Sequence, residues 1–350
     1  MTTLIRKPIE LEPLILAEEV RKTLADNAKA VDKNELPARY GIELLGSLGL
    51  FEYSSLLDAI RAEREIARED LSVAFGGWAQ LMVIRYLEVG GTPLALKLRD
   101  ELLAGTRPGV TAMAPSFKTA AGGGSIPLAA TKVDGGYSIS GKLNWASNLA
   151  EDSVIVSSAE TADGERFFFV VEGNAEGLDL GKPFGLLGLN ATSSSWITID
   201  GLVVPEANIL SRDFFGFLAQ VRPALFLLQT SECLGVAESA VAAASTKLTG
   251  MNEVFADDVY RVAGEIEALI AEQEELAQQD DPDQVALIKL RLAAAQATVD
   301  ATALEVRTAG GSGYAFSSPA SRRFREATFL PVQSPNEAQL KWQLEKLGVA

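Results

Sequence analysis

The chain has 350 residues, 47% hydrophobic and 22% charged, with 30 glycines and 14 prolines, an ordinary composition for two or three folded domains. Its 31 basic and 47 acidic residues give a net charge of −16, and such a surface repels nucleic-acid phosphates and anionic lipid. The absence of histidine and the single cysteine, Cys233, exclude histidine-activated nucleophiles and a disulfide framework. They also disfavour a zinc or copper site.

The first residues, MTTLIRKPIELEPLI, contain no apolar segment typical of a signal peptide. The longest apolar runs, such as FFFVV at 167–171, are too short to span a bilayer. A single thiol fits a reducing compartment. We therefore expect a soluble cytoplasmic protein without a nucleic-acid partner, a membrane partner or a bound metal.

Residues 1–105 are predicted to form an N-terminal helical domain. LEPLILAEEVRKTLADNAKAVDKN and ARYGIELLGSLGLFEY carry apolar residues at spacings near three and four. SSLLDAIRAEREIAREDLSVAFGGWAQLMVIRYLEVGG predicts a long helix interrupted at Gly76 and Gly77. TPLALKLRDELLAGTRPG opens with a proline near its first helical position and closes with glycine, as helices commonly do.

Residues 106–211 are predicted to form a small β-barrel or sandwich. Short β-branched and aromatic runs, beginning with GVTAMAPS, are separated by Gly, Asp, Asn and Pro at hairpin-like distances. KVDGGYSI predicts a hairpin, because its Asp-Gly-Gly sequence tolerates positive φ.

Residues 212–350 are predicted to form an antiparallel four-helix bundle. RPALFLLQTSECLGVAESAVAAASTKL, EVFADDVYRVAGEIEALIAEQEELAQQ, PDQVALIKLRLAAAQATVDATALEVRTAG and a stretch over roughly 318–348 read as four helices of similar length. The fold class is therefore α+β and multidomain: helices, then a β domain, then a helical bundle.

The stretch GKLNWASNLAED, 141–152, offers a flat apolar plate, Trp145, beside the polar groups of Ser147 and Asn148. A flat heteroaromatic ligand needs both. The alternative is that Trp145 packs in the core of the β domain and Ser147 is an ordinary strand residue.

In its domain order and in four local stretches the sequence resembles the acyl-CoA dehydrogenase superfamily of flavoproteins. The stretches are LLGSLGLFEY, GGYSISGKLNWASNLAED, LGLNATSSSWITIDGLVVPEANIL and RTAGGSGYAFSSPASRRFREA. The resemblance implies bound FAD, with Trp145 packed near the isoalloxazine ring and the Ser147 hydroxyl near its N5 atom. Asn148 and Ala112 would lie in the segments that line the flavin.

The same resemblance implies that the loop with Gly310, Gly311 and Gly313 contacts the adenosine half of FAD across a subunit interface of a homodimer or homotetramer. A glycine turn at a helix end explains these residues equally well. Arg322, Arg323 and Arg325 read as helix-face and interface charges.

One departure from the family concerns the cofactor phosphates. NEVFA stands where the family has R-x-x-F-G, so Asn252 replaces the arginine that reaches the FAD pyrophosphate and Ala256 replaces the glycine. A charge-assisted hydrogen bond is worth ~1.5–3 kcal/mol. The loss leaves three options: weaker FAD binding, FMN in place of FAD, or a substitute cation.

A second departure concerns the base that removes a proton from the acyl thioester. FLPVQSPNEAQLKW places Ser334 where the family has its glutamate, and a serine hydroxyl needs an activator that this chain lacks. Glu337 and Glu232 are the candidate replacement bases. The simpler interpretations are a first-turn glutamate capped by Asn336 or Ser334, and a position on the polar face of a helix.

The other base position of the family falls on Leu225, which is not a carboxylate. Arg222 matches an arginine at the start of that helix and is either a substrate-binding residue near the flavin or a helix-end charge. AMAPSFKTAAGGGS also lacks the family's T-E-P-x-x-G-S-D pattern, which disfavours an ordinary fatty acyl-CoA substrate.

These observations favour a flavin-dependent oxidoreductase that acts on an acyl-CoA thioester or another small organic substrate and lacks the usual catalytic glutamate. One alternative is a two-component monooxygenase that receives reduced FMN or FAD from a separate flavin reductase. The two departures favour it, whereas the missing histidines disfavour it. Another alternative is a catalytically silent binding or assembly subunit.

Overall fold

The structure of the chain is a computed structural model that describes residues 7–349. Residues 1–6 and Ala350 lie outside the described residues, and with them the beginning of the segment predicted to lack a signal peptide and the outer limits of the two terminal domains. Within the described part of the chain, no helix is long and apolar enough to cross a membrane. The same residues contain no group of three or more His, Cys, Asp or Glu side chains placed to hold a metal ion.

The first part of the chain is helical, as predicted. Its helices are α1 (Glu18–Asp32), α2 (Arg39–Ser47), α3 (Leu56–Glu69), α4 (Leu71–Gly90) and α5 (Pro93–Leu103). The side chain of Thr92 caps α5, whose first residue is proline.

The predicted interruption at Gly76 and Gly77 is wrong, because α4 runs through both glycines and the helix breaks at Asp70 instead. The Asp70 carboxylate accepts hydrogen bonds from the backbone N–H groups of Ser72 and Val73, which starts a new helix. Gly76 serves close packing, whereas a Cβ on Gly77 would make only an ordinary contact. A Cβ on Gly76 would lie 3.3 Å from the side-chain oxygen of Asn148, and one on Gly77 would lie 3.6 Å from a Glu63 carboxylate oxygen.

The middle of the chain forms one eight-stranded sheet with the strand order β6-β7-β3-β2-β4-β5-β8 and β1 paired with β4. The strands are β1 (Gly109–Thr111), β2 (Leu128–Val133), β3 (Gly136–Ala146), β4 (Val154–Thr161), β5 (Arg166–Glu172), β6 (Leu178–Leu180), β7 (Ser195–Pro205) and β8 (Ile209–Ser211). The predicted hairpin is confirmed, since β2 pairs antiparallel with β3 and Gly135 has φ of 75° at the turn. The domain limits at 106 and 211 stay a prediction.

The segment after β1 departs from the prediction. GVTAMAPS was expected to be extended throughout, but the strand ends at Thr111 and α6 (Ala114–Ala120) follows at once. Pro115 lies in the first turn of α6, where its missing N–H costs no hydrogen bond. This helix forms one wall of a cleft described below.

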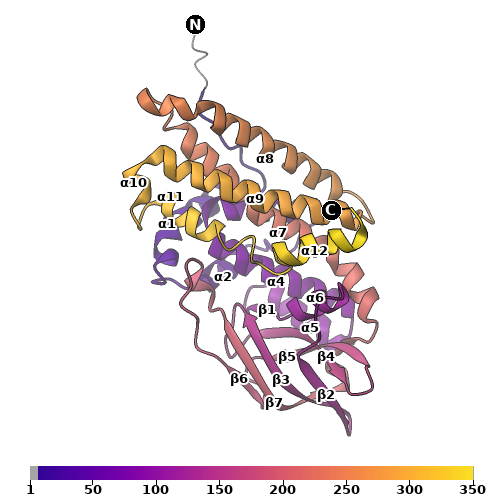
Figure 1. Cartoon of the computed structure of the whole chain (residues 1–350). Helices are drawn as coiled ribbons and strands as arrows, with labels where there is room; N and C mark the ends of the chain where they lie inside the picture. Colours follow the sequence, from indigo (N-terminus) through magenta and orange to yellow (C-terminus); the bar gives the residue numbers. More distant parts are fainter. Residues whose placement is uncertain (1–6, 350) are drawn as a thin grey trace.

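The last part of the chain contains three long helices, α7 (Phe214–Ser245), α8 (Ala256–Leu276) and α9 (Gln284–Ala309). Three shorter ones follow, α10 (Gly311–Tyr314), α11 (Pro319–Ala327) and α12 (Glu337–Leu347). The expected continuous helix over 318–348 is therefore wrong, because 328–336 is not helical and separates α11 from α12. Figure 1 shows the long helices at one end of the molecule and the strands at the other. Helix α4 contacts both α7 and strands β1 and β8, so the three parts of the fold meet around it.

Candidate functional site

The indole of Trp145, at the end of β3, is 63% exposed. Trp is usually highly buried, because its large apolar surface is costly to hydrate. The interpretation that Trp145 fills the core of the β domain is therefore wrong. One side of the indole packs against Phe184, with ring centroids 4.6 Å apart and planes inclined at 56°. The aromatic surface that remains open can stack on a flat ligand.

A chain of hydroxyl groups orients the Ser147 side chain beside this indole. The Thr192 hydroxyl donates to the Leu189 carbonyl at 2.8 Å, which uses its only hydrogen. Thr192 must then accept from Ser194, and Ser194 must accept from Ser147, each across 2.7 Å. The Ser147 hydrogen is thus directed into the protein, and its remaining lone pair makes Ser147 an acceptor toward a ligand.

Asn148 holds this corner of the sheet in place. Its backbone has φ of 61°, a left-handed conformation that asparagine tolerates. The buried side-chain nitrogen donates to the carbonyls of Gly76 in α4 and Gly109 in β1, at 3.0 and 3.1 Å. Both amide hydrogens are therefore used inside the protein, so Asn148 positions Trp145 and Ser147 by tying β3 to its neighbours.

The other predicted cofactor residues, Ala112 and the three glycines, form no hydrogen bond with Trp145 within residues 7–349. Ala112 is buried, with its N–H bonded to Val156 and its carbonyl bonded to the Ser157 hydroxyl. Gly310 ends α9 with φ of 61°, and a Cβ on Gly310 or Gly311 would meet nothing within 4 Å. A Cβ on Gly313 would lie 2.5 Å from that of Ala309, so Gly313 allows α10 to pack on α9. Contact between these glycines and a cofactor stays a prediction.

The position of the family's phosphate-binding arginine carries no positive charge here. The Asn252 side-chain nitrogen donates to the carbonyls of Lys247 and Thr308, at 3.2 and 2.9 Å. The three nearby arginines of the sequence motif form ion pairs within the chain. These pairs are Arg322 with Glu326, Arg323 with Glu305 and Arg325 with Asp32.

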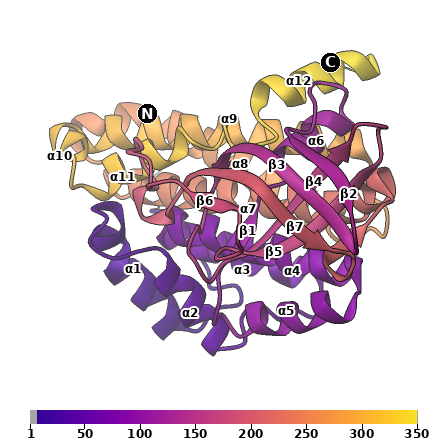
Figure 2. The same ribbon diagram turned by 90° about the horizontal axis from the view of Figure 1, so that it is seen from below.

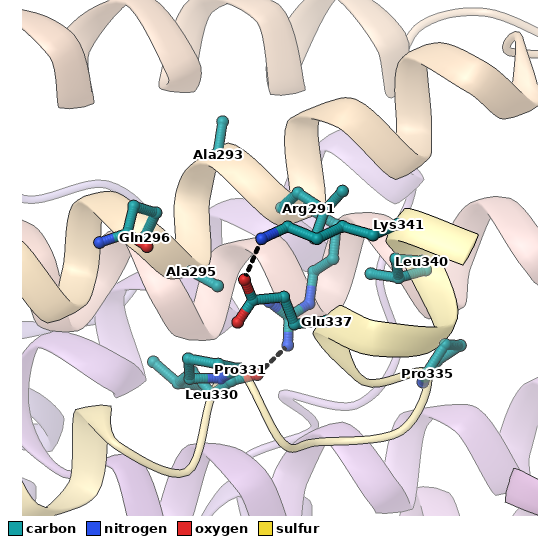
Figure 3. A pocket seen from close by; sticks show the side chains of 11 residues that line it. Arg291, Ala293, Ala295, Gln296, Leu330, Pro331, Pro335, Glu337, Leu340 and Lys341 are labelled. Carbon is teal, nitrogen blue, oxygen red and sulfur yellow. Dashed lines mark hydrogen bonds and ion pairs between the residues drawn. The ribbon is translucent and has the colours of Figure 1, made fainter. Parts of the chain in front are cut away.

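Glu337 is a first-turn residue of α12, and the capping interpretation is confirmed. The Asn336 side chain accepts from the Gln339 N–H, and the Glu337 carboxylate forms an ion pair with Lys341. Glu337 lines a cavity of about 270 Å³ between α9 and α12. Figure 3 shows its side chain among those that line the cavity. Neither Trp145 nor Ser147 lines this cavity.

Ser334 and Glu232 also form no hydrogen bond with Trp145 within residues 7–349. Ser334 uses its carbonyl to accept from the Gln229 side chain at 2.9 Å. Glu232 is fully buried, so the interpretation as a polar-face residue is wrong. Burial raises its pKa to about 8, against a hydrogen bond from Gln333 and the nearby Arg291 guanidinium, which lower it. Glu232 is therefore largely protonated at neutral pH.

Glu63, which faces Glu232, is a buried carboxyl group that no sequence pattern indicated. It is fully buried, neither of its oxygens has a hydrogen-bond partner among residues 7–349, and burial and then Glu232 raise its pKa well above the usual range. The surrounding sequence, AEREIARE, is typical of an exposed helix. In the structure this helix is buried, and its Arg64 and Arg68 pair with Glu238 of α7, which no local pattern indicates.

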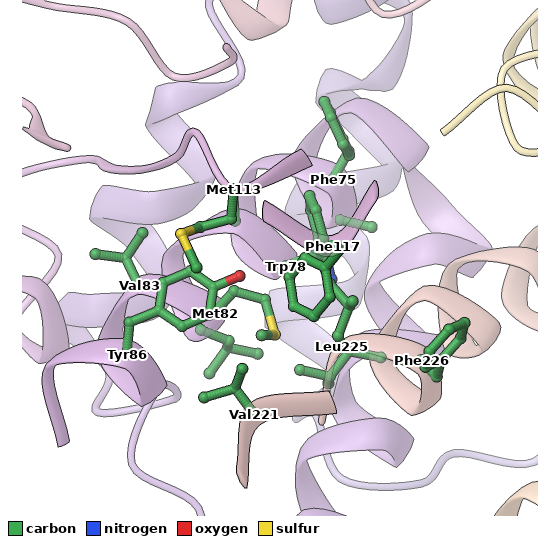
Figure 4. Packing of buried hydrophobic residues seen from close by; sticks show 14 of the residues in the cluster. Phe75, Trp78, Met82, Val83, Tyr86, Met113, Phe117, Val221, Leu225 and Phe226 are labelled. Atoms are coloured by element: carbon green, nitrogen blue, oxygen red, sulfur yellow. The ribbon is translucent and has the colours of Figure 1, made fainter. Parts of the chain in front are cut away.

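Behind the sheet, apolar side chains fill the space between α4, α6 and α7. Figure 4 shows Trp78, Met82 and Tyr86 of α4 packed among side chains of the other two helices. Leu225, the family's second base position, belongs to this packed core and is 2% exposed.

Comparison with known sequences gives partial matches, and no protein-family model matches the chain. Benzylmalonyl-CoA dehydrogenase of Aromatoleum aromaticum is 29% identical over 227 residues, which are 63% of this chain and 58% of that protein. Isovaleryl-CoA dehydrogenase of Arabidopsis thaliana is 28% identical over 219 residues, 56% of this chain and 53% of that protein. The matches thus span little more than half the length of these relatives.

Solved structures are similar over nearly the whole chain. A glutaryl-CoA dehydrogenase in complex with glutaryl-CoA has a TM-score of 0.84 and 20% identity, covering 98% of each chain. KijD3 in complex with FMN and a dTDP-linked sugar has a TM-score of 0.76 and 17% identity, covering 95% of this chain and 92% of that one. At these identities the likeness concerns the fold.

Proposed function

We propose that the chain belongs to the acyl-CoA dehydrogenase superfamily and is a flavin-dependent oxidoreductase acting on a small organic substrate. The observation that carries the proposal is the exposed indole of Trp145 beside the oriented hydroxyl of Ser147. A bound flavin would supply hydride transfer or the activation of oxygen. Trp145 would stack on the ring, and Ser147 would bond to its N5 edge.

The residues fit the ring of a flavin better than the pyrophosphate of FAD. The open indole and the adjacent hydroxyl match a flat heteroaromatic edge, whereas Asn252 offers no cation and its amide hydrogens are bound inside the protein. FAD is what family membership implies, and the Asn252 environment favours FMN. We expect the adenylate half of FAD to add less than tenfold to the affinity.

Replacing Trp145 with alanine tests the proposal. We expect FMN and FAD to bind the wild type and to bind W145A at least about fivefold more weakly, since base–aromatic stacking is worth ~1–3 kcal/mol. Equilibrium titration followed by flavin fluorescence measures both affinities. The control is Trp196→Ala on the paired strand β7, where the indole is also partly exposed. Equal binding by W145A and W196A would contradict the proposal, as would a wild type that takes up neither oxidised nor reduced flavin.

A second candidate function is a monooxygenase that uses reduced flavin from a separate reductase, and the orientation of Ser147 favours it. Reduced flavin carries N–H at N5 and needs an acceptor, whereas oxidised flavin needs a donor there. Ser147 is an acceptor toward the ligand, because its hydrogen is engaged by Ser194. Ser334, at the family's base position, carries a hydroxyl that this histidine-free chain cannot activate, which also favours this candidate.

This orientation predicts a preference for reduced flavin that depends on Ser194. We expect the wild type to bind reduced FMN about tenfold more tightly than oxidised FMN, because one mismatched hydrogen bond costs ~1–2 kcal/mol. In S194A the Ser147 hydrogen is free to donate, so the ratio should fall toward one. The midpoint potential of bound FMN should then fall by about 30 mV, the equivalent of tenfold for two electrons. Ser138→Ala, in β3, is the control, and an unchanged ratio in S194A would contradict the assigned orientation.

The remaining features of the proposal follow from family membership and composition. We propose a homodimer or homotetramer in the cytoplasm, with a thioester among the candidate substrates and a flavin reductase as partner of the monooxygenase. A catalytically silent assembly subunit would differ by failing to bind either redox form of the flavin. Flavin titration therefore separates the enzyme from the silent subunit before any substrate is identified.

A further inference from the structure

A small cleft of about 40 Å³ lies where four segments distant in sequence meet. Its walls come from α6, α7, the first residue of α9, and α12 together with Pro335, two residues before α12 begins. Figure 2 shows α6 beside α12, and Cβ atoms on Gly122 and Gly123 would lie within 4 Å of the Trp342 ring. The lining residues are Phe117, Ala120, Ala121, Arg222, Phe226, Gln284, Pro335, Gln339 and Gln343.

Arg222 is the only charged residue among those that line the cleft. It is partly buried, and desolvation lowers the pKa of its guanidinium. One nitrogen donates to the Gln284 side-chain oxygen at 3.1 Å, and no carboxylate among residues 7–349 forms an ion pair with Arg222. By contrast, Arg61 and Arg107 each have a carboxylate oxygen within 3 Å.

Arg222 thus lacks a carboxylate partner in a protein with a net charge of −16, where acidic side chains are plentiful. Partial desolvation without a counter-charge destabilises the folded state. A bound anion would restore the lost interactions through charge-assisted hydrogen bonds. The free donors of the guanidinium and the nearby amides of Gln339 and Gln343 supply the groups that such an anion needs.

The size and charge of the cleft favour a carboxylate over a phosphate. Roughly 10–15 Å³ of such space is enough for one water molecule, so a cleft of about 40 Å³ holds a group of a few heavy atoms. The planar fork of an arginine matches a carboxylate, whereas a phosphate dianion calls for further cations that the lining does not contain. The rings of Phe117 and Phe226 form apolar walls for a short hydrocarbon chain.

We propose that the cleft around Arg222 binds the carboxylate of a small organic acid, with Phe117 and Phe226 holding the adjoining carbon chain. The inference rests on the proposed function where it takes this acid to be the substrate. It then limits the substrate class to compounds that carry a carboxylate. The binding of the anion itself requires no flavin.

Binding of butyrate to the purified full-length protein tests the inference. At constant ionic strength, we expect butyrate to raise the melting temperature and to give a saturable isotherm by calorimetry, and neutral butyramide to do neither. Arg222→Gln should weaken butyrate binding at least tenfold, and Arg222→Lys should weaken it less, because lysine keeps the charge and loses the fork. Arg85→Gln, which removes an exposed arginine paired with Glu88, should leave binding unchanged.

Three results would overturn the inference: butyramide binding as well as butyrate, R222Q binding as tightly as the wild type, or phosphate binding more tightly than butyrate. Flavin titration of the same preparations distinguishes failure of the carboxylate site from failure of the proposed function. A protein that binds flavin and not butyrate loses only the carboxylate site. One that binds butyrate and not flavin keeps the site, and the bound acid is then not the substrate of a flavoenzyme.

Discussion

Replacing Glu232 with glutamine should make the protein more stable at pH 8, by on the order of 4 kcal/mol. The carboxyl group of Glu232 has no contact with solvent, and one of its oxygens lacks a hydrogen-bond partner among residues 7–349. The other oxygen accepts from the Gln333 side chain at 2.7 Å. Glutamine keeps that acceptor and removes the charge that would form beside Glu63.

The sign of the effect follows from the pKa of Glu232, which burial raises from 4.5 to about 8 in the folded protein. Below pH 4.5 the group is protonated in both the folded and the unfolded chain. Between about pH 4.5 and 8 the unfolded chain releases the proton and the folded chain retains it, so the free energy of unfolding falls as pH rises. The advantage of E232Q should therefore be absent at pH 4 and largest at pH 8.

Urea denaturation of both proteins at pH 4, 6 and 8 measures this difference. Glu274→Gln is the matched control, because hydrogen bonds and charges from Arg61 and Arg64 lower the pKa of Glu274. That substitution should destabilise the protein at pH 8 and have less effect at pH 4. If E232Q shows no gain at pH 8, a cation or a donor compensates the Glu232 carboxylate in the folded protein.

Replacing Arg291 with methionine should destabilise the protein by about 3–5 kcal/mol. Arg291 lies in α9, is 1% exposed, and donates to the Leu330 carbonyl at 2.7 Å and the Gln333 side chain at 3.1 Å. It also contacts Cys233 and Gln229 of α7, at 3.3 and 3.4 Å. The substitution leaves several buried acceptors unpaired and removes the cation nearest Glu232.

The loss should concentrate in the segment 328–336, which Arg291 ties to α7 and α9. Urea denaturation gives the loss of stability, and amide hydrogen exchange should show faster exchange over this segment before global unfolding. Arg261→Met, which removes an exposed i,i+4 pair with Glu265, should change stability by less than about 0.5 kcal/mol. A cost below about 1 kcal/mol for R291M would mean that its partners find other donors.

Local signals in the sequence predicted the elements whose causes are local. The turn at Gly135 needs only positive φ, and Asn336 caps α12 from the position adjacent to its first residue. The break at Asp70 was within reach by the same reasoning, since its carboxylate caps the next helix. Gly76 and Gly77 were misjudged because their contacts come from Asn148 and Glu63, which are distant in sequence.

The order of helices, strands and helices could be predicted from the sequence, because the spacing of apolar residues carries that information. Residue type likewise identified Trp145 and Ser147 as a pair suited to a flat ring. The tertiary structure was needed to show that the indole is exposed to solvent and that Ser194 and Thr192 make Ser147 an acceptor. It was also needed to show that Glu232 faces Glu63 and that Arg222 has no carboxylate partner. Burial and charge pairing depend on segments up to hundreds of residues apart, and no local pattern specifies which of them meet.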